Sequence, residues 1–178
     1  MKYSPTANND VVRLLEAEGA EAVVPDIVGF MNYSLYNQIW RYEHLGMAKK
    51  SKMIADFTIM AIERLQKPMD KALRASTRFE GIHSIHQLAE QASEIVSIGN
   101  HTGEGWFLTG EMIDLLENNV NNIICLQPFG CLPNHVVGKG VMKELRRQYP
   151  QANIAAIDYD PGCLLYTSPS PRDRTRSR

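Results

Sequence analysis

The chain has 178 residues, of which 44% are hydrophobic and 22% charged, and its formal net charge is -1. This length and apolar content suffice for a buried core and favour one domain, or one domain with an insertion, whereas the near-neutral charge argues against a nucleic-acid partner. No apolar run approaches the roughly 18 residues that span a bilayer, and the N-terminus lacks the apolar centre of a signal peptide, so we expect a cytoplasmic protein with no membrane partner.

The first residues predict the edge of a parallel sheet. We interpret Met1–Ser4 as a shortened strand, from which we expect an upstream portion of the sheet to be absent. The polar residues 8–10 can cap a helix over 11–17, and Gly19 can close it in the left-handed conformation. The apolar run Ala22–Pro25 then predicts a strand.

From about Ile27 to Ser76 the pattern changes to long helices, which we expect to form an insertion packed over the sheet. The helical pattern is expected to break near Gly46 and before Pro68. A stripe with helical spacing within this insertion predicts core packing. Its members are Met53, Ile54, Phe57, Met60 and Ala61.

The second half of the chain alternates between helices and strands. The pattern predicts helices over 84–96, 106–117 and 137–148, and strands over 122–125 and 154–157. Strands that alternate with helices indicate a parallel sheet. The fold class expected for residues 1–162 is therefore α/β, a truncated Rossmann-like or flavodoxin-like sheet with the helical insertion at 27–76.

The C-terminal segment differs from the rest of the chain. After Tyr166 it contains almost no apolar residue and is rich in Arg, Ser and Pro, which predicts disorder. A basic tail that contacts nucleic acid or an acidic partner is one interpretation. However, the composition changes abruptly after Gly162 and the string resembles translated adapter sequence. We therefore expect residues 163–178 to be non-native, and Cys163 is discounted as a ligand.

Three cysteines without an export signal favour free thiols, metal ligation or catalysis over disulfides. Cys125 and Cys131 lie in the segment CLQPFGCLPNH, which follows the strand over 122–125. Ligands bind at the carboxyl ends of strands in open α/β sheets. The C-x5-C spacing alone is a weak metal signal, and the alternative is a buried Cys125 with an incidental Cys131. Gly130 and Pro133 flank Cys131 and favour it as the presented thiolate, whereas Cys125 is expected in the core.

The glycine-containing loop over 99–105 precedes a helix but lacks the lysine of a nucleotide-binding P-loop. It either caps the helix or lines a cofactor pocket, in which case Glu104 and His101 would take part. We expect His101 and His135 beside Cys131. Each could donate a hydrogen bond to a thioester oxygen or a cluster sulfur, or be an ordinary solvated loop residue. His83 and His86 are expected to be surface residues.

Several segments carry a family resemblance. The stretches NNDVVRLLEAEG (8–19), EAVVPD (21–26), GEGWFLTGE (103–111) and, most specifically, QPFGCLPNH (127–135) resemble the 2-hydroxyacyl-CoA dehydratase-like region of large CoA-substrate-specific enzyme activases. The resemblance implies a [4Fe-4S] cluster, low-potential electron transfer to an acyl-CoA-like substrate and an ATPase activator as partner. By resemblance, Cys131 is the expected cluster ligand and Cys125 a second choice.

The number of cysteines limits what this chain could do by itself. A cubane cluster requires about three or four thiolates, which this chain does not supply, so the remaining ligands are expected from a missing portion of the parent protein and the fragment alone is expected to be inactive. A non-catalytic scaffold that docks an ATPase partner is the alternative function, and a zinc-stabilised domain is a third.

Overall fold

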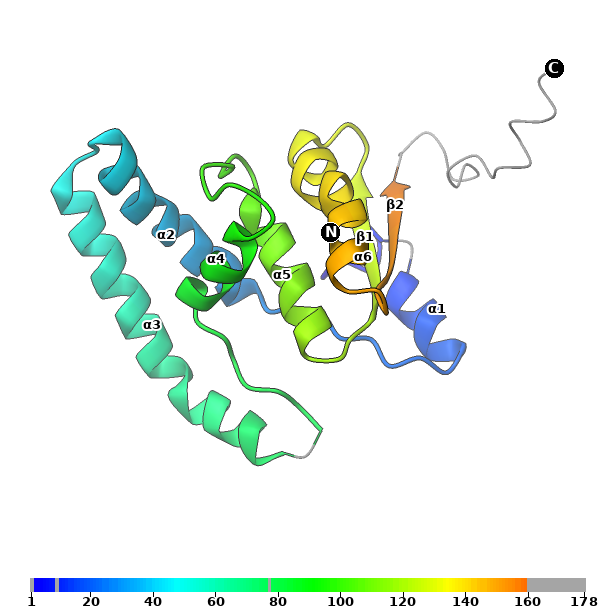
Figure 1. Ribbon diagram of the computed structural model, residues 1–178. Helices are drawn as coiled ribbons and strands as arrows, with labels where there is room; N and C mark the ends of the chain where they lie inside the picture. Colours follow the sequence, from blue (N-terminus) through cyan, green and yellow to red (C-terminus); the bar gives the residue numbers. More distant parts are fainter. Residues whose placement is uncertain (1, 9, 77, 160–178) are drawn as a thin grey trace, which may run out of the picture. The chain divides into compact units, whose positions relative to one another are not determined.

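The computed structural model describes residues 2–8, 10–76 and 78–159. The chain divides into two compact units. The sheet unit comprises Met1–Val24 and Val120–Arg178, and the helical unit comprises Pro25–Asn119. The described residues form six α-helices and a two-stranded parallel sheet, an architecture compatible with an α/β protein (Figure 1).

The sheet unit is built on one strand–helix–strand crossover. Strand β1 (Asn122–Pro128) pairs in parallel with β2 (Asn153–Tyr159), in a register that runs from Asn122 opposite Asn153 to Pro128 opposite Tyr159. Between them lie a π-helical segment η1 (Asn134–Gly138), a short 3₁₀ segment η2 (Lys139–Val141) and helix α6 (Met142–Gln148). A parallel pair requires such a crossover, because the chain must return to the same edge of the sheet. The predicted strands over 122–125 and 154–157 are confirmed and extend further. The helix predicted over 137–148 is confirmed only over 142–148, since residues 137–141 are π-helical and 3₁₀.

The beginning of the chain differs from the prediction. Helix α1 (Val11–Ala17) forms where expected, and Gly19 follows it with φ of +87°. Its N-cap, Asp10, makes no side-chain cap hydrogen bond. Within the described residues, the predictions of strands at Met1–Ser4 and Ala22–Pro25 are wrong: residues 2–3 and 5–8 form turns, and residues 22–25 have no regular structure, while Met1 lies outside the described residues. A strand persists only where a neighbour accepts its backbone hydrogen bonds, and β1 and β2 pair only with each other within the described chain.

The helical unit contains α2 (Ile27–Leu45), α3 (Lys49–Ala75), α4 (Ile85–Ser93) and α5 (Trp106–Glu117). Local signals define three of the helix ends. Asp26 Oδ1 accepts a hydrogen bond from the Gly29 N–H at 2.7 Å, and Ser84 forms a reciprocal capping box with Gln87. Gly46 ends α2 with φ of +65°.

Helix α3 continues through Pro68, so the expected break is wrong. A proline inside a helix removes one hydrogen bond and crowds the carbonyl four residues earlier, which here belongs to Arg64. Arg64 and Pro68 are both exposed, so solvent can satisfy the carbonyl that loses its partner. No helix in the described ranges has both the length and the apolar content needed to cross a membrane.

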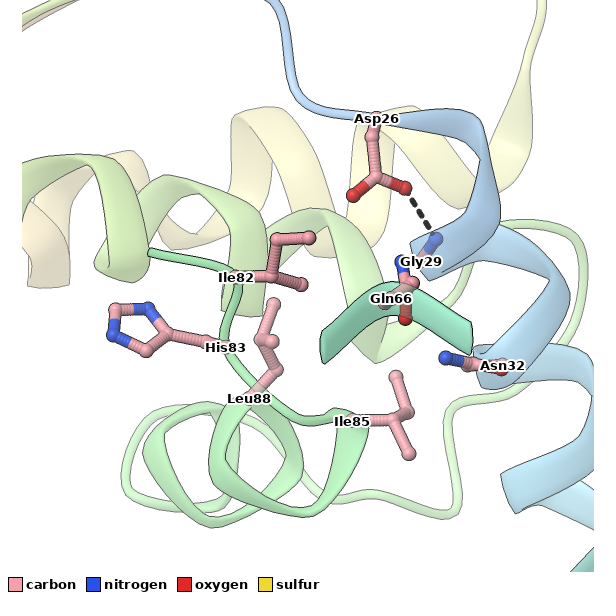
Figure 2. Close-up of a pocket in the computed structure, with 8 residues that line it drawn as sticks. All are labelled: Asp26, Gly29, Asn32, Gln66, Ile82, His83, Ile85 and Leu88. Carbon is pink, nitrogen blue, oxygen red and sulfur yellow. Dashed lines mark hydrogen bonds between the residues drawn. The ribbon is translucent and has the colours of Figure 1, made fainter. Parts of the chain in front are cut away.

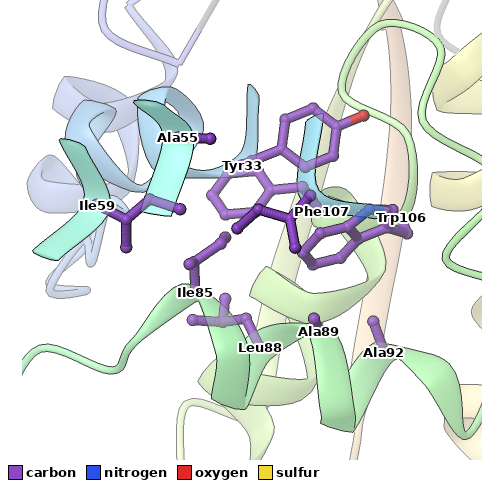
Figure 3. Packing of buried hydrophobic residues seen from close by; sticks show 10 residues of the cluster. Tyr33, Ala55, Ile59, Ile85, Leu88, Ala89, Ala92, Trp106 and Phe107 are labelled. Carbon is purple, nitrogen blue, oxygen red and sulfur yellow. The ribbon is translucent and has the colours of Figure 1, made fainter. Parts of the chain in front are cut away.

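One cluster forms the core of the helical unit (Figure 3). It gathers residues from all four helices: Tyr33, Ile39, Ala55, Ile59, Ile85, Leu88, Ala89, Ala92, Trp106 and Phe107. The rings of Tyr33 and Trp106 meet edge to face, with centroids 5.2 Å apart. From α3, only small or slender side chains enter this cluster. The predicted core stripe of that helix is therefore wrong, since Met53, Ile54, Phe57 and Met60 are exposed.

Gly105 provides a test of this packing. Its φ is +48°, and a Cβ there would lie 2.2 Å from the Asn100 carbonyl oxygen and 2.4 Å from the Tyr33 hydroxyl oxygen. We expect Gly105→Ala to lower the free energy of unfolding by about 3 kcal/mol or more, because strain and steric overlap add. Urea unfolding followed by tryptophan fluorescence measures this unit, which holds both Trp40 and Trp106.

Gly46→Ala is the matched control. Gly46 has a similar φ of +65°, but a Cβ at this position would meet no heavy atom within 4 Å. Gly46→Ala should lower the free energy of unfolding by only about 1 kcal/mol, the cost of placing alanine in the left-handed backbone conformation. Equal losses in the two variants would contradict the packing at Gly105.

Candidate functional site

The accessible thiol of Cys131 lies in a tight turn at the carboxyl end of β1. The Cys131 N–H donates to the Pro128 carbonyl oxygen at 3.1 Å, and Gly130 provides the positive φ of +66° that this turn requires. Phe129 and Leu132 beside it are 70% and 69% exposed. The thiol is thus presented on a constrained loop between two exposed apolar side chains, where sequence reasoning placed it.

Cys125 occupies a different environment. Its side chain is 9% exposed on the buried face of β1, which also carries Ile123 and Gln127. A Cβ at Gly138 would lie 3.2 Å from its sulfur, so that glycine allows η1 to pass close to the thiol. Burial agrees with the expected core position of Cys125 and leaves Cys131 as the more accessible thiol of the two.

A chain of polar contacts connects the two cysteines. Gln127, which is fully buried, donates from Nε2 to the Asn134 carbonyl oxygen at 3.3 Å and contacts the Cys125 sulfur at 3.9 Å. Asn134, 4% exposed, donates from Nδ2 to the Cys131 sulfur at 3.3 Å. The Asn134 amide thus directs one of its N–H groups at the Cys131 sulfur and fixes the position of that sulfur relative to the π-helical segment.

Gln127 and Asn134 were not identified from the sequence as site residues. A signal was present for Gln127, because the alternation Ile123, Cys125, Gln127 puts a polar amide on the buried face of the strand. Asn134 begins the π-helical segment, and such segments are rare and frequently occur at functional sites. No sequence pattern separates that conformation from the α-helix.

His135 lies in the same loop as Cys131, as predicted. Its Nδ1 is 2.8 Å from the Cys131 carbonyl oxygen, which can only accept, so Nδ1 carries the hydrogen. The imidazole is therefore held by the backbone of Cys131, and Nε2 of this exposed residue is the ring nitrogen that this bond does not use.

His101 and Glu104 belong to the helical unit, in the loop before α5. That loop satisfies the start of α5 through its backbone, since the Trp106 N–H donates to the Asn100 carbonyl oxygen at 2.7 Å. Arg41 Nε donates to His101 Nε2 at 3.2 Å, and burial together with the Arg41 charge lowers the pKa of His101. The hydrogen bond from Trp106 to Asn100 thus supports the interpretation that this loop caps the helix. That His101 and Glu104 lie close to Cys131 stays a prediction.

The remaining histidines have structural partners. His83 bonds through Nδ1 to the Asp114 carboxylate, and His86 packs edge-on against the Tyr36 ring. His83 also lines a cavity of about 20 Å³, with Asp26 and Asn32 among the other residues around it (Figure 2). Space of that size holds about one water molecule. Across the described ranges, no three His, Cys, Asp or Glu side chains converge as a metal site.

Thiol labelling tests the contrast between the cysteines. In a Cys163→Ser background, we expect Cys131 to react with a disulfide reagent roughly tenfold or more faster than Cys125, because a buried thiol reacts only after local opening. Cys131→Ser should remove the fast phase, and Cys125→Ser should leave it intact. Loss of the fast phase on replacing Cys125 would contradict the assignment.

His101 predicts a pH dependence of stability. The unfolded imidazole titrates near 6.5, whereas the folded one has a lowered pKa. Below about pH 6.5 the unfolded state therefore binds more protons, so the stabilisation is complete above this pH and is lost as pH falls toward the folded pKa. His101→Gln keeps an acceptor for Arg41 without titrating. Its urea midpoint should fall less than that of the wild type between about pH 7.5 and 5.5.

Comparison of the chain with protein-family models, with curated proteins and with solved structures finds no match. The resemblance carried by residues 127–135 therefore stays a prediction. What the structure itself provides is an accessible thiol on a glycine turn at the end of β1, with an amide donor at its sulfur.

Proposed function

We propose that the chain is part of an iron-sulfur protein of the 2-hydroxyacyl-CoA dehydratase or activase type, in which Cys131 is one ligand of a [4Fe-4S] cluster. The observation that carries this proposal is the position of Cys131, accessible and constrained, at the carboxyl end of a parallel strand. We also propose that the small parallel sheet is part of a larger Rossmann-like or flavodoxin-like domain in the parent protein. The substrate would be an acyl-CoA-like thioester, and an ATPase activator would be the partner.

The described residues supply one ligand but not the whole set. A cubane cluster takes three or four thiolates, and Cys125 is enclosed by Gln127 and Gly138. The other ligands would come from further parts of the parent protein or from a partner. Such a cluster supplies one-electron chemistry when it is bound.

This chain's own contribution would be to orient and tune the sulfur. The turn through Gly130 would direct the Cys131 sulfur toward the cluster, and the Asn134 amide would donate a hydrogen bond to that sulfur, the kind of contact by which a protein tunes the reduction potential of a cluster. Phe129 and Leu132 would limit water around the sulfur once a partner covers them.

A non-catalytic docking domain is the second candidate. It is favoured by the incomplete ligand set within the described residues and by the exposed apolar side chains of α3. Such a domain requires no cluster, so metal content separates the two functions.

The test is iron and sulfide analysis of the full-length gene product, read past Gly162 and purified without oxygen. We expect about four irons per chain with a broad absorbance in the visible blue. Cys131→Ala should lower the bound iron by more than half, and Cys131→Ser should retain more of it, because a hydroxyl oxygen can partly replace the thiolate. Both variants are compared with His83→Ala, which should keep full iron content.

Unchanged iron in Cys131→Ala would refute the ligand assignment. Protein that stays free of iron after anaerobic reconstitution would refute the cluster and favour the docking domain. Zinc without visible absorbance would identify a zinc-stabilised domain instead.

A further inference from the structure

Helix α3 has two apolar faces, and the helical unit buries only one of them. Ala55 and Ile59 face the core and are 1% and 3% exposed. Met53, Ile54, Phe57 and Met60 are 61%, 55%, 67% and 58% exposed. At 3.6 residues per turn, the two sets lie on roughly opposite sides of the helix. We name Met53, Ile54, Phe57, Met60 and Ala61 the outer stripe.

The spacing of the outer stripe suits another helix. Met53 and Ala61 each lie four residues from Phe57, and Ile54 and Met60 each lie three residues from it, the pattern of a helix–helix seam. Two of the five are methionines, whose flexible side chains adapt to a partner surface. The stripe is also short and narrow, about two and a half turns, which favours a helix over a broad membrane surface.

The charges at the two ends of the outer stripe are positive, while the exposed Asp56 lies along one side of it. Lys50 lies one turn before it and Arg64 one turn after it on the same side of the helix, and both are exposed. Lys49 and Lys50 line a shallow surface hollow together with Met53, Ile54 and Phe57. Helix α3 carries seven basic and three acidic residues, in a chain whose net charge is -1. An apolar stripe with basic ends complements an apolar face flanked by carboxylates.

A second copy of this chain is a poorer match. Antiparallel pairing of two stripes would bring Lys50 toward Arg64 of the other copy, and parallel pairing would bring like residues together. Both arrangements oppose positive charges across a desolvated contact, which is unfavourable.

We propose that the outer stripe of α3 binds an amphipathic helix of a partner protein, one whose apolar face is flanked by Asp and Glu. Phe57 and Met60 provide the central apolar contacts, while Lys50 and Arg64 select the acidic partner and set its register. Cys131 takes no part, so this binding is independent of the proposed cluster.

Two synthetic helices test the proposal on the full chain. Both have about 21 residues and the same leucine seam, and the positions beside the seam are Glu in one and Lys in the other. Fluorescence anisotropy of the labelled peptides measures affinity. We expect the Glu peptide to bind at least roughly tenfold more tightly than the Lys peptide. Lys50→Gln with Arg64→Gln should abolish most of this preference, and added salt should weaken it.

Paired variants separate the stripe from general hydrophobicity. Phe57→Ser with Met60→Ser should weaken binding of the Glu peptide roughly tenfold or more. Met69→Ser is the matched control, because Met69 is 54% exposed on α3 but lies off the outer stripe. It should bind as the wild type does, and all variants should keep the wild-type urea midpoint.

Five results would overturn the proposal, four of them in binding or assembly and one in stability. The first three are equal affinity for the two peptides, equal weakening by Met69→Ser, and a stripe-dependent dimer in light scattering. The fourth is stripe-dependent binding to phosphatidylglycerol vesicles without peptide binding. A large loss of stability in the Phe57 and Met60 variant would overturn it as well, since the stripe would then be covered within the chain itself.

Discussion

The packing of Tyr33 against Trp106 and Phe107 organises the helical unit, with ring centroids 5.2 and 5.4 Å apart. The polar groups of both Tyr33 and Trp106 have hydrogen-bond partners. The Tyr33 hydroxyl donates to the Gly103 carbonyl oxygen, and Trp106 Nε1 donates to Asn37 Oδ1. Buried aromatic groups stabilise most when their polar atoms are satisfied in this way. The same contacts hold the loop before α5 against α2, so the close approach at Gly105 and the bond from Arg41 to His101 both depend on this cluster.

In the sheet unit, the buried side-chain amide of Gln127 organises its surroundings in a comparable way. Gln127 donates from its core position to the Asn134 carbonyl oxygen, and Asn134 in turn donates to the sulfur of Cys131. The accessible thiol is therefore positioned from inside the sheet and not only by its own turn. These two bonds oppose other arrangements of the loop, because breaking either one would leave a buried amide N–H without its acceptor. This explains how a surface loop can hold a reactive group in a defined direction.

The two faces of helix α3 have different roles: one packs in the core, and the other is available to bind a partner. Its inward residues, Ala55 and Ile59, are small or slender and allow α2 to pack closely. Its larger side chains face outward, where the helical unit gains nothing from them. A docking surface of this kind and a cysteine ligand are compatible in one protein, because they use different units. The two proposals can therefore succeed or fail separately.

Local chemistry in the sequence was sufficient for α5, for both ends of α2, for the start of α4 and for the parallel strands β1 and β2, because caps, glycines and apolar runs act over a few residues. It also placed Cys131 in a loop after a strand. It failed at Ala22–Pro25, since a strand depends on a neighbour that the local pattern does not reveal. It failed again on α3, where both faces are apolar and periodicity alone does not say which one meets the core. Tertiary packing made that choice: the close contact with α2 and the Tyr33 cluster admits Ala55 and Ile59 and leaves Phe57 and Met60 outside.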